Sequence, residues 1–162
     1  MTKRTIRRML LAATALLAAK HAAAGLLDSP APVLQGVPGQ VIYRMGAIYY
    51  HPGEVDTVVT CTNLDDAPAI VALELFDLRD NPAGSAAHAN VARGGTVTFV
   101  TSAGPRREQW LVVEGLAAID HGKARVSATT TRLSCTGYHQ RRAADGRVRD
   151  TPLELVKRVA RP

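Results

Sequence analysis

The chain has 162 residues, a one-domain length, with a formal net charge of +6 and only 4% aromatic residues. So few aromatic residues predict a core of Val, Leu, Ile and Ala, which suits sheet packing better than a large ligand cavity. Residues 1–24 hold five basic residues and no acidic one, so their removal would lower the net charge to +1. We therefore expect no nucleic-acid partner for the remaining chain.

The N-terminus has the order of a secretory signal peptide. Four basic residues precede an apolar run from Met9 to Ala19, and small residues at 22–24 provide a cleavage site. The run has 11 residues, whereas a membrane span needs about 20. We expect a signal-peptide helix over 1–24, cleaved after Ala24, no transmembrane span in the mature chain, and a periplasmic or secreted protein. An uncleaved anchor helix is the alternative, and Arg7-Arg8 leaves open the twin-arginine route beside the secretory one.

Residues 25–40 contain three prolines and predict an extended lead-in without a stable element. A single domain is expected over 41–162. Its first strand is predicted at 41–45, continuing through 47–50, with a bulge or bend at Gly46. His51-Pro52-Gly53 predicts a turn.

The middle of the chain alternates β-type runs with turn residues. Apolar alternation predicts strands at 55–64, 69–78 and 96–101 and further strands at 110–113 and 116–119, with a weak edge strand around 89–91. Asp120-His121-Gly122 predicts a hairpin connection. Residues 123–138 then form one long strand or two joined pieces, because the apolar face changes near 129–131. A charged loop over 140–151 and a short strand at 153–156 complete the chain.

These features predict an all-β fold of about eight short strands. An antiparallel β-sandwich is the favoured architecture, and a small barrel is the other way to protect the strand edges.

Two cysteines, Cys61 and Cys135, are present, and in an exported chain two cysteines normally pair. A bridge between them would restrict the unfolded chain by about 4 kcal/mol in the chain-entropy model. Metal-binding or redox thiols are the alternative, although the chain has no Cys-x-x-Cys motif.

Cys61 on an early strand and Cys135 on a late strand resemble the cysteines of immunoglobulin-like domains over about residues 40–160. The resemblance implies an immunoglobulin-like sandwich with a disulfide between its two sheets. The chain departs from that pattern at Leu133, where the fold has a tyrosine, and at Leu75-Phe76, where it has a tryptophan. The cysteine strands also resemble those of small uncharacterised secreted bacterial sandwich proteins with one disulfide.

No motif predicts catalysis, a metal or a cofactor. The four histidines after residue 24 are widely spaced: His51, His88, His121 and His139. Asp120-His121 lies in a predicted turn, where an aspartate is common. The chain has no Gly-x-Ser-x-Gly motif. Tyr49-Tyr50-His51, beside a Pro-Gly turn, is the predicted contact surface. The alternative there is that one tyrosine packs inward and the other covers the edge of the core.

The C-terminal region is basic, with seven basic and three acidic residues over 141–162. It could meet an acidic partner or an anionic surface, or form a solvated end. The sequence favours an exported, non-catalytic binding or structural module of the cell envelope, with an envelope protein or a glycan as partner. An exported enzyme or metal-binding protein, with a site assembled only in three dimensions, is the alternative.

Overall fold

The computed structural model describes residues 32–84, 86–102 and 110–157. All the regular secondary structure assigned in these residues is β-strand, which confirms the predicted all-β class. The predicted signal peptide and the first part of the lead-in lie outside these residues. Within the described ranges, no helix is long and apolar enough to cross a membrane.

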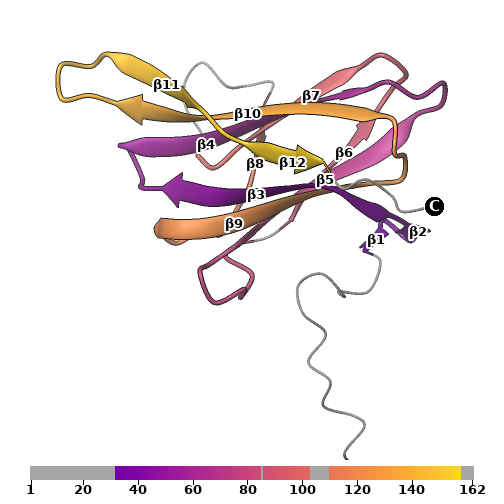
Figure 1. The fold of residues 1–162 in the computed structure, drawn as a ribbon, viewed down its shortest axis with the longest axis horizontal. Coiled ribbons are helices and arrows are strands. Elements are labelled where there is room, and N and C mark those ends of the chain that lie inside the picture. The colour runs from indigo at the N-terminus through magenta and orange to yellow at the C-terminus, as the bar shows by residue number, and fades with distance from the viewer. Residues whose placement is uncertain (1–31, 85, 103–109, 158–162) are drawn as a thin grey trace, which may run out of the picture. The chain divides into compact units, whose positions relative to one another are not determined.

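Ten of the strands form two five-stranded sheets (Figure 1). The first sheet has the order β11 (Val148–Pro152), β10 (Leu133–Arg142), β4 (Val55–Asn63), β7 (Thr96–Val100), β8 (Leu111–Val112). The second sheet has the order β12 (Leu155–Lys157), β3 (Gln40–Tyr50), β9 (Ile119–Ala128), β5 (Ala69–Phe76), β6 (Ala87–Val91). Neighbouring strands are antiparallel except β7 and β8, which are parallel.

The two sheets share one apolar core. The alternating pattern of the sequence places Val59, Phe99 and Leu133 of the first sheet in the same buried cluster as Leu73 and Val126 of the second. All five side chains are fully buried. The fold is therefore sandwich-like, and it contains more strands than the eight that the sequence predicted.

The predicted disulfide between Cys61 and Cys135 is confirmed. The two cysteines are direct partners in the register of β4 and β10, with their Cα atoms 4.1 Å apart. Both strands belong to the first sheet, so the inter-sheet bridge implied by the immunoglobulin resemblance is wrong for this chain. The bridge indicates an oxidising environment outside the cytoplasm.

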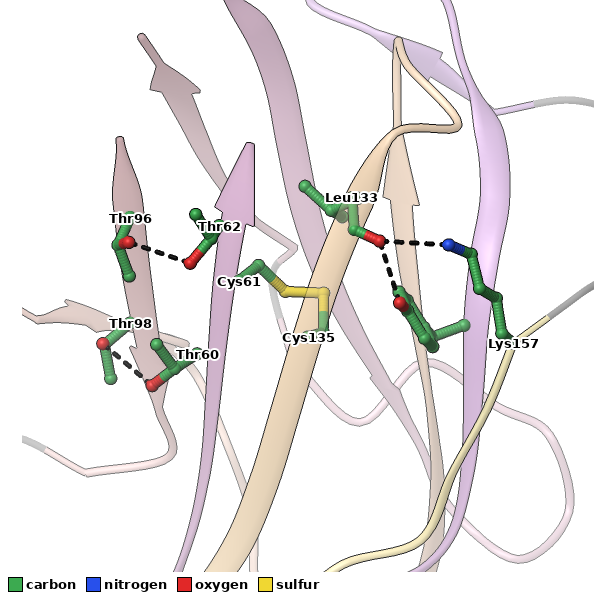
Figure 2. Close-up of a disulfide and its surroundings, with 9 residues drawn as sticks. Thr60, Cys61, Thr62, Thr96, Thr98, Leu133, Cys135 and Lys157 are labelled. Carbon is green, nitrogen blue, oxygen red and sulfur yellow. Dashed lines mark hydrogen bonds between the residues drawn. A yellow bond between two sulfur atoms is a disulfide. The ribbon is translucent and has the colours of Figure 1, made fainter. Parts of the chain in front are cut away.

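The strand pairing explains how the bridge fits. The Leu64 N–H donates to the Arg132 carbonyl, and the Arg142 N–H donates to the Glu54 carbonyl. The hydrogen-bonded pairs of β4 and β10 are therefore the even-numbered residues. The cysteines, at odd positions, form a non-hydrogen-bonded pair, where side chains approach most closely. The flanking threonines point to the opposite face, and Figure 2 shows their hydroxyls pairing with β7, Thr60 with Thr98 at 3.0 Å and Thr62 with Thr96 at 2.9 Å.

One carbonyl beside the disulfide links the first sheet to the second. The Leu133 carbonyl oxygen accepts hydrogen bonds from the Tyr43 hydroxyl of β3 at 2.8 Å and from Lys157 Nζ of β12 at 3.3 Å. Figure 2 shows that this carbonyl lies close to Cys135 on the same strand. The contact therefore ties the disulfide-bearing strand to the facing sheet.

The lead-in predicted over 25–40 contains an element that the sequence did not predict. Strands β1 (Val33–Leu34) and β2 (Val37–Pro38) form a two-residue hairpin. Gln35 and Gly36 both have positive φ, as a tight hairpin turn requires. Leu34 is 2% exposed, so its burial holds a segment that is otherwise rich in proline.

Two predicted loops are strands instead. Asp120-His121-Gly122 lies inside β9. The glycine is explained by packing and not by a turn, since a Cβ at position 122 would lie 2.6 Å from the Phe76 carbonyl oxygen. The loop predicted over 140–151 contains the end of β10 and the first four residues of β11, a strand whose five residues are all exposed. Such a strand carries no apolar alternation for sequence reasoning to find. Of the two alternatives for 123–138, two pieces are correct. β9 ends at Ala128 and β10 begins at Leu133, so the change of face near 129–131 is a crossing between the two sheets.

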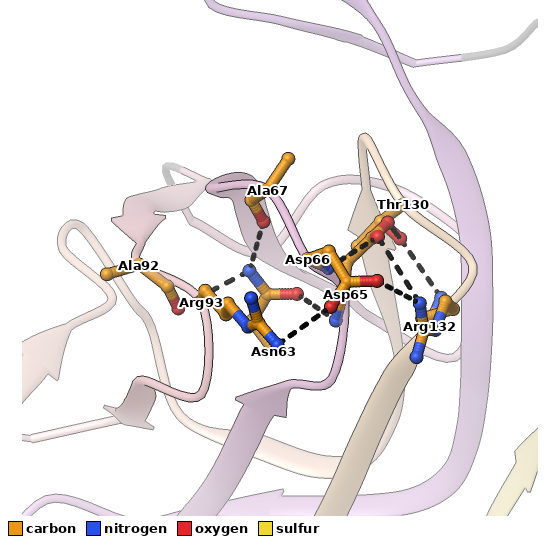
Figure 3. A network of polar contacts seen from close by, with 8 residues as sticks. All are labelled: Asn63, Asp65, Asp66, Ala67, Ala92, Arg93, Thr130 and Arg132. Atoms are coloured by element: carbon orange, nitrogen blue, oxygen red, sulfur yellow. Dashed lines mark hydrogen bonds and ion pairs between the residues drawn. The ribbon is translucent and has the colours of Figure 1, made fainter.

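A polar network joins the loops at the Asn63 end of β4 (Figure 3). Asn63 is fully buried; its amide nitrogen donates to the carbonyls of Ala67 and Val91, and its amide oxygen accepts from the Asp65 backbone. The Thr130 hydroxyl donates to Asp65, and this bond lowers the pKa of the Asp65 carboxyl. Around the outside, Asp66 pairs with two arginines, Arg93 at 3.1 Å and Arg132 at 3.0 Å.

Replacing both cysteines by alanine should lower the free energy of unfolding by about 4 kcal/mol, because the bridge closes a 74-residue separation in the unfolded chain. Urea unfolding measures the change. The control is Ser134→Ala with Thr136→Ala, which alters exposed neighbours on β10 and should cost within about 0.5 kcal/mol each. Two free thiols in the freshly purified exported protein, detected by mass spectrometry, would contradict the cross-link.

Asn63→Ala should destabilise the fold by about 1–3 kcal/mol, because it leaves buried and half-buried backbone groups of the 64–68 loop and of the end of β6 without this partner. Asn90→Ala, at an exposed position on β6, is the matched control and should change the free energy of unfolding by less than about 0.5 kcal/mol. Equal effects of the two substitutions in urea unfolding would show that the Asn63 network does not stabilise the fold.

Candidate functional site at the strand ends

Two irregularities in the pairing of β3 with β9 shape the candidate site. Between the pairs Met45–Ala124 and Ile48–Gly122, β3 has two residues opposite one on β9. Between Ile48–Gly122 and Tyr50–Ile119 the excess is reversed, with two residues of β9 opposite Tyr49. Bulges of this kind redirect side chains and are frequent beside functional sites.

The second bulge brings together residues that are about 70 positions apart in sequence. Both residues opposite Tyr49, Asp120 and His121, contact the end of β3. The Tyr49 hydroxyl lies 2.9 Å from His121 Nδ1, and His51 Nε2 donates to Asp120 Oδ1 at 2.9 Å. The side chains of His51 and Asp120 are 38% and 82% exposed, so this hydrogen-bonded pair meets solvent. Together with His139, described next, we call these residues the strand-end cluster: Tyr49, His51, Asp120, His121 and His139.

His139 joins the cluster from the other sheet. Its ring lies edge-on to Tyr49, with ring centroids 5.3 Å apart, and the His121 ring packs edge-on to the same tyrosine at 5.0 Å. His139 Nε2 donates to the Ala47 carbonyl oxygen at 2.8 Å. Ala47 lies in the first bulge with a φ of 52°, so both bulges contribute to the cluster.

The hydrogen bond to Ala47 fixes which ring nitrogen of His139 carries a proton. A carbonyl oxygen only accepts, so Nε2 carries the proton of the neutral ring. The Thr57 hydroxyl lies 3.2 Å from Nδ1 and donates to the Tyr49 carbonyl oxygen at 2.8 Å. Burial lowers the pKa of His139 below its ordinary value, and the bond to Ala47 partly offsets this effect. The ring is therefore held neutral between the two sheets near neutral pH.

The predicted contact surface, Tyr49-Tyr50-His51, is divided by the structure. Tyr49 and His51 belong to the cluster, whereas Tyr50 is 8% exposed and packs in the core. Tyr50 also borders a hollow of about 590 Å³, whose lining includes Asp56, Thr101, Glu114, Leu116 and Arg142. The hollow has the size of a small-molecule site, and it mixes apolar walls with charges of both signs.

Of the four histidines considered from sequence, three lie in the strand-end cluster, and His88 lies on β6 at the edge of the second sheet. Sequence reasoning missed Asp120, His121 and His139 as neighbours of Tyr49. The signal in the sequence was His121 beside Asp120, which was interpreted as a turn. Within the described ranges, no group of three or more His, Cys, Asp or Glu side chains is placed to hold a metal ion.

The chain was compared with protein-family models, with curated proteins and with solved structures, and none of the three comparisons finds a match.

Acidification should destabilise the protein through His139. In the unfolded chain this residue takes up a proton near pH 6.5, whereas the folded protein resists protonation to lower pH because its pKa is lowered. The contribution of neutral His139 to the free energy of unfolding is thus complete above about pH 6.5, and it is lost as the pH falls toward the folded-state pKa of this residue.

Urea unfolding from pH 7.5 to 5 tests this prediction. The free energy of unfolding should fall less steeply with decreasing pH in His139→Gln than in the wild type, while Asn90→Ala, which removes no titratable group, should keep the wild-type slope. Hydrogen bonds lower the pKa of Asp65 and Asp77, so these carboxyls titrate below this range. A wild-type slope in His139→Gln would show that this residue is not the source.

Proposed function

We propose that the chain is an exported, non-catalytic binding or structural module of the cell envelope, and that it contacts its partner through the strand-end cluster. The partner is an envelope protein or a glycan, and the scaffold is of the immunoglobulin-like sandwich type. The observation that carries the proposal is the pair of bulges in β3 and β9, which gathers an aromatic ring, an exposed His51–Asp120 hydrogen bond and a second histidine at one end of the sheet.

Three features support a role in binding. Each bulge interrupts the sheet ladder, a cost that proteins retain where a side chain must be redirected. Tyr49 presents an amphipathic ring, whose apolar body packs on two imidazoles, while its hydroxyl, already bonded to His121 Nδ1, has capacity for a second hydrogen bond. The disulfide and the facing sheets hold these groups on strands, where little conformational entropy is lost on binding.

The envelope location rests on two observations of different kinds. The disulfide belongs to an oxidising compartment. The N-terminal order of basic, apolar and small residues predicts export with cleavage after Ala24. Edman sequencing of the exported protein should therefore begin at Gly25, and a mature chain that begins at Met1 would contradict the predicted cleavage.

The alternative is an exported enzyme or metal-binding protein with a site assembled in three dimensions. It is favoured by one observation, the approach of His121 and His139 to the same tyrosine. Titration with Zn²⁺ and Cu²⁺ decides between the two proposals. Stoichiometric binding that is lost in His121→Asn and kept in His88→Asn would favour the alternative, because His88 lies on the edge strand β6, which β5 separates from β9.

Photo-crosslinking tests the binding proposal. A photoreactive residue at position 51, in living cells, should form a reproducible adduct with one envelope protein or glycan. The same residue at position 93, in the loop network at the Asn63 end of β4, is the matched control and should not form that adduct. Replacing His51 and Asp120 by alanine should weaken partner capture by about tenfold. No adduct from position 51, in cells where the protein is exported, would overturn the proposal.

A further inference from the structure

The hairpin formed by the end of β10 and β11 is strongly basic. Residues 141–149, which we call the arginine hairpin, hold four arginines and a single carboxylate, Asp145. All four arginines are exposed: Arg141, Arg142, Arg147 and Arg149. In Figure 1 the turn that joins β10 to β11 projects past the nearby end of β4.

The register places like charges directly opposite each other. Arg141 on β10 is the cross-strand partner of Arg149 on β11, so both side chains point to the same face. Arg142, the next residue, points to the other face beside Val148. Unneutralised like charges in this position repel and weaken the pairing of the strands.

Few carboxylates compensate these charges. Arg147 pairs with Asp145 at 3.5 Å. In the part of the chain that the structure describes, the side chains of Arg141, Arg142 and Arg149 make no hydrogen bond or ion pair. An anion from outside could therefore bind the guanidinium groups of Arg141, Arg142 and Arg149 without displacing a partner among the described residues.

Protection of a sheet edge is the simpler explanation for charged residues on an edge strand, and it does not account for this arrangement. One charge and a proline are enough to block edge pairing, and β11 already has Asp150 and Pro152. The arginines lie on both strands, on both faces and at the turn, so the charge surrounds the tip of the hairpin.

The shape of the edge also argues against a peptide as partner. Backbone bonds from Ala143 to Arg147 and from Leu153 to Gly137 place the hydrogen-bonded pairs of the hairpin at odd positions. On the free edge of β11, only Val148 and Asp150 therefore turn both their N–H and C=O groups outward. An added strand would gain few main-chain bonds there, whereas a surface met by the tip engages every arginine.

We propose that the arginine hairpin binds an anionic lipid surface, tip first, through the phosphate groups of the lipids. Guanidinium groups form paired hydrogen bonds with phosphate oxygens, and each arginine near an anionic bilayer adds to the attraction. Val148, which is 52% exposed beside Arg142, adds a small apolar contact. The inference deepens the proposed envelope function and rests on the export that it assumes.

Vesicle sedimentation tests the proposal. The full chain is expressed, and the form that the cell exports is purified and mixed with vesicles of phosphatidylglycerol and phosphatidylcholine, or of phosphatidylcholine alone. The wild type should bind the anionic vesicles only, and less tightly as salt is raised. Arg141→Gln with Arg149→Gln should lower the partition coefficient by about 10- to 30-fold.

The matched control is Arg79→Gln with Arg93→Gln, which removes the same charge from exposed positions outside the hairpin. It should bind within about twofold of the wild type, since only charges near the surface contribute. A second pair, Arg142→Gln with Arg147→Gln, should weaken binding as the first does. Circular dichroism should show all variants folded, because every altered side chain is exposed.

Three results would overturn the proposal: absence of wild-type binding to anionic vesicles, an equal loss in the control, and preferential binding of a soluble polyglutamate peptide that depends on Arg141 and Arg149. The last result would identify an acidic peptide as the partner. Failure here is distinguishable from failure of the proposed function, because the adduct formed at position 51 does not involve the hairpin arginines.

Discussion

The register between β4 and β10 is the constraint on which most of the structure depends. It runs without a break from Leu133 opposite Asn63 to Arg141 opposite Val55. With this register the cysteines meet at a close, non-hydrogen-bonded pair, their threonine neighbours face outward, and His139 points inward beneath Tyr49. A slip of one residue would turn every one of these side chains to the opposite face. The disulfide makes such a slip impossible without breaking a covalent bond.

The same register connects stability with the candidate site. His139 reaches the Ala47 carbonyl only because the first sheet is held at this alignment over the second, and Leu133 accepts bonds from β3 and β12 close to the disulfide. The site is thus built from both sheets. The positions of its groups are fixed by covalent and hydrogen-bonded links that lie elsewhere in the core.

Alternation of apolar residues was enough to predict the strands whose two faces differ, which are β4, β5 and β7. It failed where other forces decide the backbone. β11 is exposed on both faces and is held by pairing alone. Glycine is typical of turns, but Gly122 is needed because only a residue without a side chain can pack this close to the Phe76 carbonyl. For the site, Tyr49 and His51 were predicted from their place beside a turn. Their partners depend on bulges, which are properties of two strands together and cannot be read from one.

The crossing from β11 to β12 has a consequence for the order in which the fold is completed. The segment 148–157 pairs first with β10 and then with β3, so it covers one long strand in each sheet. All four outermost strands then have five residues or fewer, namely β6, β8, β11 and β12. Short outer strands offer little template for pairing with another molecule. Because this segment is synthesised after β3 and β10, these two strands expose their backbone edges until it arrives. A chain truncated before residue 148 would therefore gain a tendency to self-associate.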